Sequence, residues 1–312
     1  MKRLLTALLL ALYLTAATAS GGDAGDPLIS LSYLEGDFSQ TLETVIESRL
    51  DASDEVIRQR LTGNTTLKEG DVLNASAGMS FTLLGGEVQV SGGMLVDVTE
   101  GREVPSGLLE PNHRYIAAED AAFKVEAPAA VVSWEGPAVL ELSNQPDYYA
   151  IARALRSRGL FQGSGSGIGE GFDLYLAPTR GEGLVMFIRL LGEEPDALAC
   201  TESHPFRDVP AWLDRYVAWA WQKGYSNGVS AGRFDPDQPI SAAEYVELLL
   251  RALGYSAAGE NDYASSLERA ADCGLLNEAE YTLLTEKAFR RAHVAYVSYY
   301  SLEPSAEIPR LN

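Results

Sequence analysis

The stretch Thr179-Arg180-Gly181-Glu182 returns about sixty residues later in the chain as Ser241-Ala242-Ala243-Glu244. The residues around the two copies match as well: Phe172 pairs with Phe234, Arg189 with Arg251 and Gly192 with Gly254 at one common offset. Upstream, Gly159 with Gly163 matches Gly224 with Gly228, because the two glycines have the same spacing in each copy. Apolar residues at helical spacing follow each copy, for example Leu184, Phe187, Ile188 and Leu191. Short helix pairs cannot bury such stripes alone, so the repetition predicts helix–loop–helix units packed against one another.

The repeated stretch has the composition of a helix start. Thr179 with Glu182, and Ser241 with Glu244, give the pattern S/T-x-x-E before an apolar run, which is a capping box. The hydroxyl accepts a hydrogen bond from a free N–H of the first turn, and the carboxylate accepts one from the N–H of the cap residue. Folding therefore explains these four residues without a ligand.

Arg180 is not explained in this way. A cation in the first turn opposes the helix dipole, and capping does not require it. A guanidinium beside a helix N-terminus would instead suit an anionic ligand. The second copy has Ala242 at this position, so we expect it to hold shape without binding an acidic group.

The segment 204–236 resembles the S-layer homology (SLH) repeat. It reads HPFRDVPAW at 204–212, YVAWA at 216–220, KGYSNGV at 223–229 and GRFDP at 232–236. Asp208, Gly224, Gly228 and Phe234 are the positions that carry the motif. The first copy, 146–199, lacks the F-x-DVP opening and has a Gly/Ser-rich insertion at 163–171, while the third, 256–303, is eroded to Phe289-Arg290-Arg291-Ala292-His293 at its box.

The resemblance implies three repeats, 146–199, 204–255 and 256–303, in an all-α module of pseudo-threefold symmetry. It also implies an anionic, often pyruvylated, secondary cell-wall polysaccharide as ligand, bound by box arginines that face grooves between repeats. That role falls on Arg180 and Arg291, although Arg291 as a plain surface charge remains open. Trp212 could stack on a sugar ring or pack in the core, and Ser164 and Ser166 could donate to sugar hydroxyls.

The N-terminal half has a different sequence pattern. Lys2 and Arg3 before an apolar run, with Ala17-Thr18-Ala19 beyond it, predict a signal peptide at 1–19, a retained anchor being the alternative. A flexible leader at 20–38 precedes a helix and a small β sandwich or roll within 39–145, where short β-like runs alternate with glycine. A tail follows at 304–312. The fold class expected for the chain is therefore α+β.

Composition limits the possible functions. The chain has 312 residues and a formal net charge of −20, so we expect no nucleic-acid partner and no binding to anionic membranes. No spacing suggests a metal or a cofactor. Cys200 and Cys273 could pair or stay separate. The group Asp97, Thr99 and His113 could suggest catalysis, but no nucleophile motif surrounds it, so no enzymatic activity is expected.

The expected function is that of a secreted cell-wall or cell-surface protein, without a membrane span in its mature chain. Its helical repeats would anchor it non-covalently to wall polysaccharide and display the β domain. Two alternatives stay open: a wall-associated extracellular enzyme active in the N-terminal half, and a degenerate SLH scaffold that binds other envelope proteins.

Overall fold

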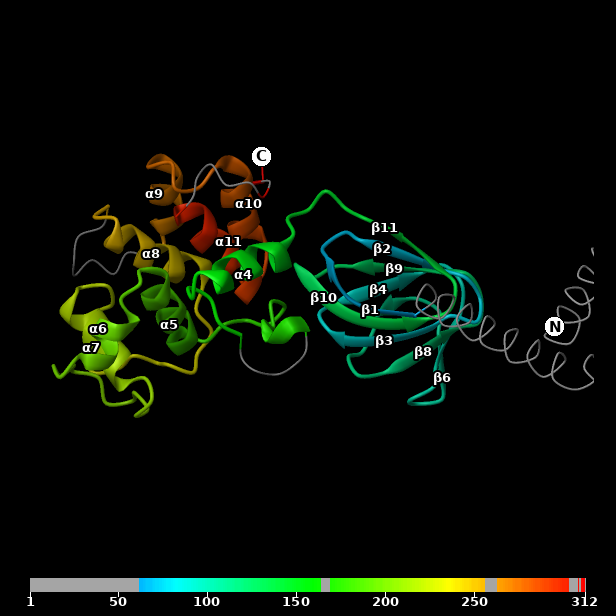
Figure 1. Cartoon of the computed structure of the whole chain (residues 1–312), viewed down its shortest axis with the longest axis horizontal. Helices are drawn as coiled ribbons and strands as arrows, with labels where there is room; N and C mark the ends of the chain where they lie inside the picture. Colours follow the sequence, from blue (N-terminus) through cyan, green and yellow to red (C-terminus); the bar gives the residue numbers. More distant parts are fainter. Residues whose placement is uncertain (1–61, 164–168, 256–262, 303–307, 309, 312) are drawn as a thin grey trace, which may run out of the picture. The chain divides into compact units, whose positions relative to one another are not determined.

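A computed structural model describes residues 62–163, 169–255, 263–302, 308, 310 and 311 (Figure 1). The predicted signal peptide, leader and N-terminal helix lie outside these residues, as do Ser164 and Ser166. The described residues fall within one compact unit, Gln59–Asn312. Strands come first along the chain and helices follow, which confirms the α+β class. Among these residues, no helix combines the length and the apolarity that a membrane crossing demands.

The strands form two antiparallel sheets. Their bounds are β1 Thr62–Lys68, β2 Val72–Ala75, β3 Ser80–Gly85, β4 Val88–Ser91, β5 Leu95–Asp97, β6 Arg102–Val104, β7 Gly107–Leu108, β8 Arg114–Ala117, β9 Ala121–Val125, β10 Ala129–Glu135 and β11 Ala138–Glu141. One sheet has the order β1-β10-β3-β8-β5-β6, and the other has the order β11-β2-β9-β4-β7. The sequence predicts β-like runs at 79–84, 87–90, 94–98, 114–117, 122–125 and 131–134. These runs lie within one or two residues of β3, β4, β5, β8, β9 and β10.

Alternating side chains hold the two sheets face to face. In β3 and β4 every second residue is buried, which is the pattern of a strand with one face on a core. The rings of Phe81 in one sheet and Phe123 in the other stack with their centroids 4.4 Å apart. The interior of the sandwich is therefore filled by side chains.

The helices follow from residue 148 onward. Their bounds are α4 Tyr148–Ser157, α5 Arg180–Leu190, α6 Glu194–Ala199, α7 Asp214–Gln222, α8 Ala242–Ala252, α9 Ser266–Asp272, α10 Glu278–Glu286 and α11 Arg291–Leu302, with a 3-10 turn at Gly169–Gly171. Helix α5 packs against α7, α8 against α9, and α11 against α4. In the third copy the sequence predicts one helix within 262–274 and a second that starts at 289–293, and these correspond to α9 and α11. The sequence does not predict α6 or α10.

Both predicted capping boxes are present. The Thr179 hydroxyl accepts from the Glu182 N–H at 3.2 Å, and the Glu182 carboxylate accepts from the Thr179 N–H at 2.9 Å. Ser241 and Glu244 repeat this arrangement at 3.2 and 2.8 Å.

Loss of the first cap should have a moderate cost. We expect Thr179→Ala to lower the free energy of unfolding by about 1 kcal/mol, because a helix N–H loses its acceptor. Urea unfolding followed by circular dichroism measures this. Thr282→Ala is the control, since this exposed hydroxyl donates, among the described residues, to the Glu278 carbonyl of its own helix and its loss should change stability by less than about 0.5 kcal/mol. Equal losses for the two variants would contradict the role of the cap.

One detail differs from the sequence expectation, and a second answers a question that the sequence left open. The sequence predicts one helix that carries Trp212, Trp219 and Trp221, but α7 begins at Asp214, so Trp212 lies in the turn before it. The DVP segment and its turn delay the helix, and the Trp212 side chain is 58% exposed as a result. Cys200 and Cys273 are both free and half-buried, which answers the question that their spacing left open.

Candidate functional site

The motif residues of the 204–236 segment tie its two ends together. The Asp208 carboxylate accepts from the N–H groups of Phe234 and Asp235, each at 2.9 Å. Burial raises the pKa of Asp208, but these backbone donors outweigh it and hold the pKa below its usual range. The F-x-DVP turn is thereby fixed to the G-x-F loop.

Glycines close the same loop. Gly224 and Gly228 have φ values of 72° and 69°, a region that other residues rarely adopt. A Cβ on Gly228 would lie 2.3 Å from the Phe206 ring and 2.5 Å from the Arg233 carbonyl oxygen. The motif positions Asp208, Gly224, Gly228 and Phe234 are therefore explained by local folding.

Arg180 lies between the first and second copies of the repeat. Its guanidinium donates to the Asp235 carbonyl at 2.9 Å, to the Phe234 carbonyl at 3.4 Å and to the Glu244 carboxylate at 2.6 Å. The side chain is 14% exposed and lines a cavity of only about 20 Å³. Arg180, which helix capping does not require, thus has its partners in the loop and the box of the second copy.

The pKa of Glu244 reflects its ion pair with Arg180. Burial raises the pKa of Glu244, but the Ser241 N–H and the Arg180 guanidinium outweigh burial and hold the pKa below its usual range. The charge of Arg180 is therefore balanced within the protein.

Arg291 makes the corresponding contacts with the first copy. Its Nε donates to the Phe172 carbonyl at 3.0 Å and its Nη2 to the Gln162 carbonyl at 3.4 Å, while its Nη1 lies 3.9 Å from the Glu182 carboxylate. Because the residue is 5% exposed, it is not a plain surface charge. Burial lowers the pKa of Arg291.

The backbone of the two arginines repeats as well. The Arg180 N–H donates to the Gln238 carbonyl and the Arg291 N–H donates to the Leu176 carbonyl, two acceptors at equivalent places in their loops. The two arginines are therefore held by the same backbone arrangement in both contacts.

A larger cleft, of about 430 Å³, lies beside Arg291. We call it the Arg291 cleft; its lining residues include Glu182, Arg189, Trp212, Tyr216 and Arg291. It brings together two of the site residues predicted from sequence, Trp212 and Arg291, and leaves Arg180 in the small cavity. Arg189 and Tyr216 were not predicted as lining, although the recurrence of an arginine at 189 and 251 was a signal. Arg189 is ion-paired with Glu194 at 2.8 Å and keeps 21% of its side chain exposed.

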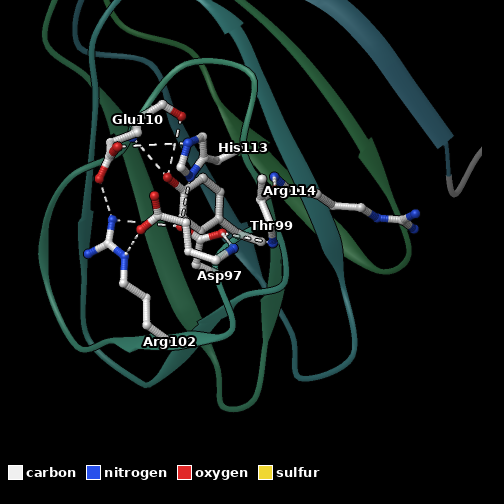
Figure 2. Close-up of polar contacts among 8 residues, drawn as sticks. Asp97, Thr99, Arg102, Glu110, His113 and Arg114 are labelled. Atoms are coloured by element: carbon white, nitrogen blue, oxygen red, sulfur yellow. Dashed lines mark hydrogen bonds and ion pairs between the residues drawn. The ribbon is translucent and has the colours of Figure 1, made fainter.

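A second polar group lies at one end of β5 and β8. The sequence expectation left Asp97, Thr99 and His113 without a shared role, but the structure brings them together with Arg102 and Glu110 (Figure 2). His113 Nδ1 lies 2.8 Å from the Asp97 carboxylate, and Thr99 Oγ1 accepts from the Arg114 N–H at 2.9 Å.

The S-layer homology domain family matches residues 205–246 of this chain. A protein named cell surface protein from Thermoanaerobacter kivui is 33% identical over 103 residues. That match covers 32% of this chain and 13% of the relative's length. The chain thus contains an S-layer homology domain, and a domain of this family indicates a protein of the cell surface.

Solved structures give weaker likenesses. Procruciferin, an 11S globulin from Brassica napus, is 12% identical with a TM-score of 0.19, over 31% of this chain and 27% of that chain. The coconut allergen cocosin is 13% identical with a TM-score of 0.18, over 34% and 31%. Scores this low carry no argument about fold or function.

Proposed function

We propose that this chain is a non-enzymatic, exported envelope protein that binds an anionic wall polysaccharide in the Arg291 cleft and displays its β sandwich. The cleft itself carries the proposal: it places an exposed tryptophan beside two arginines and one glutamate. An aromatic face suits a sugar ring, and guanidinium groups suit a carboxylate on that sugar.

The proposal includes three SLH repeats in a closed module. Its support is the cyclic order of the contacts, in which the second helix of each copy packs against the first helix of the next. Arg180 reaches from the first copy to the second, and Arg291 reaches from the third to the first. A closed ring of three helix pairs satisfies all of these contacts at once.

The two box arginines then have unequal roles. Arg180 is held by Glu244 beside a cavity too small for a sugar, so we assign it to the contact between copies. Arg291 both holds the first copy and borders the cleft, where Arg189 adds a second, more exposed cation. The anionic ligand is therefore expected at Arg189 and Arg291, next to Trp212.

The β sandwich supports display rather than catalysis. Its interior is occupied by packed side chains such as Phe81, Tyr115 and Phe123, each about 1% exposed. An enzyme with a buried substrate pocket would need that space to be open.

Trp212→Ala tests the cleft. We expect roughly tenfold weaker binding of the full mature chain to isolated cell-wall material, because a stacking surface worth about 1.4 kcal/mol is lost. Co-sedimentation at several protein concentrations measures this. The control is Tyr255→Ala, an aromatic residue that is 57% exposed and does not line the cleft. Equal affinity for wild type and Trp212→Ala would remove the cleft as the site, and no wall binding by the wild type would remove the proposed function.

Salt concentration separates the proposal from the scaffold alternative. Binding through arginines to a charged glycan should weaken as salt rises. Wall material stripped of its secondary polysaccharide should not retain the chain, whereas a protein scaffold would still bind the wall proteins.

A further inference from the structure

The polar group at the end of β5 and β8 contains potential metal ligands. Ligand atoms of Glu100, Glu110 and His113 all lie within 4.8 Å of one another. Glu100 follows β5, while Glu110 and His113 lie in the segment between β7 and β8. Pairing of β5 with β8, with Asp97 opposite Tyr115, brings these two segments together.

A buried carboxylate fixes the orientation of the His113 ring through its Nδ1 atom. Asp97 is fully buried, and its Oδ2 accepts from His113 Nδ1–H at 2.8 Å. The other oxygen of Asp97 accepts from the N–H groups of Thr99 and Glu100 at 3.0 and 3.2 Å. With the proton of the neutral ring on Nδ1, the lone pair of Nε2 faces the Glu110 carboxylate, 3.7 Å away. A carboxylate behind a histidine is the usual support of a metal-binding imidazole.

The charge of the group is unbalanced. Three carboxylates, Asp97, Glu100 and Glu110, surround one cation, Arg102, whose guanidinium lies between Glu110 and Asp97 in Figure 2. Because the Arg102 side chain is 46% exposed, it can turn into solvent at little cost. A divalent cation would then neutralise the excess negative charge.

We propose that Glu100, Glu110 and His113 bind a divalent transition-metal ion of the zinc class, with Asp97 holding the histidine. One imidazole nitrogen with two carboxylate oxygens is a donor set that Zn²⁺ accepts, whereas Ca²⁺ and Mg²⁺ favour oxygen ligands alone. Zn²⁺ would join the turn after β5 to the segment before β8. The spacing of residues 100, 110 and 113 matches no sequence signature, so the sequence by itself does not predict this metal site.

Isothermal titration of the chelator-treated full chain with zinc chloride, at mildly alkaline pH, tests the site. We expect one Zn²⁺ per chain, and at least tenfold weaker binding in His113→Gln and in Glu110→Gln. Glu110 is exposed, so its variant should fold normally even if His113→Gln does not. Saturating Zn²⁺ should also raise the melting temperature of the wild type.

His204→Gln is the matched control, because His204 also lies beside a carboxylate, that of Asp214 at 3.1 Å, but without further ligands among the described residues. It should bind Zn²⁺ as the wild type does. Absence of binding, equal binding by Glu110→Gln, or equal affinity for Ca²⁺ and Zn²⁺ would overturn the site. These outcomes are independent of wall binding.

Discussion

Arg291→Ala is expected to lower the free energy of unfolding by about 3 kcal/mol. The guanidinium is buried, and it is the donor to the carbonyls of Phe172 and Gln162. Its removal leaves the buried Phe172 carbonyl without this donor and opens a void between α11 and the segment that holds Phe172. Breaking one side of a buried charged contact typically costs this much.

Chemical denaturation at neutral pH measures the loss. Arg290→Ala is the control, because Arg290 is paired with Glu87 at 3.0 Å on the surface and should cost less than about 1 kcal/mol. Arg291→Lys should recover only part of the stability, since an ammonium cannot donate along two fixed directions. If Arg291→Ala unfolded at the same denaturant concentration as Arg290→Ala, the contact between copies would not contribute as described.

The loss of stability expected for Arg291→Ala also affects the interpretation of wall-binding measurements. A variant at Arg291 changes both the cleft and the packing of the helices, so loss of binding alone would not assign a ligand contact. Trp212 is exposed and free of that ambiguity, and for this reason it carries the binding test.

The helical half was predictable where signals are local. Capping boxes depend on residues three apart, and apolar stripes extend over a few turns, so Thr179, Glu182, Ser241 and Glu244 could be assigned from sequence alone. The partners of the arginines could not be. Arg180 meets Asp235 across 55 residues and Arg291 meets Phe172 across 119, and nothing in the local pattern encodes such distances.

The β half shows the same limit. Short β-like runs separated by glycines and turns located β3, β4 and β8, and the residues of these strands are alternately buried. Alternation does not say which strands pair. The approach of His113 to Asp97 follows from the pairing of β8 with β5, and the sequence alone does not predict this pairing.

The residues that depart from the box pattern change in matched pairs. Arg180 meets Glu244 and Arg291 approaches Glu182, so the pair that completes the same cyclic order is Ala242 with His293. Here both the cation and the carboxylate are replaced. Loss of one alone would leave a buried charge without a partner, which is costly. The joint change leaves neither an arginine nor a glutamate at this pair of positions.

His293 keeps part of the capping box. Its Nδ1 accepts from the Arg290 N–H at 3.1 Å, as the glutamates of the other two boxes accept from their cap residues. The proton of the ring is therefore on Nε2, which is buried without a hydrogen-bond partner among the described residues. The rings of Tyr148 and Phe289 lie against it, with centroids at 5.9 and 6.0 Å.

Acidification should therefore destabilise the fold through His293. Burial, with the nearby charges of Arg290 and Lys287, lowers the pKa of His293 from 6.5 to about 4. In the unfolded chain the imidazole takes up a proton near its ordinary pKa, but in the folded chain it does not do so until about pH 4. The unfolded state binds more protons across this window, so stability falls as the pH drops from 6.5 to about 4, by up to about 3 kcal/mol.

His293→Gln isolates this effect. Glutamine can still accept from the Arg290 N–H, as in a capping box, and it does not titrate. The difference in unfolding free energy between the two proteins, measured by denaturation at intervals from pH 7 to pH 4, cancels the contributions of all other groups. As the pH falls through this range, the unfolding free energy of the variant should rise steadily relative to that of the wild type. The reason is that residue 293 takes up a proton on unfolding only in the wild type. Parallel pH profiles would mean that the imidazole takes up its proton at the same pH in the folded protein as in the unfolded chain, and burial would then not hold it neutral.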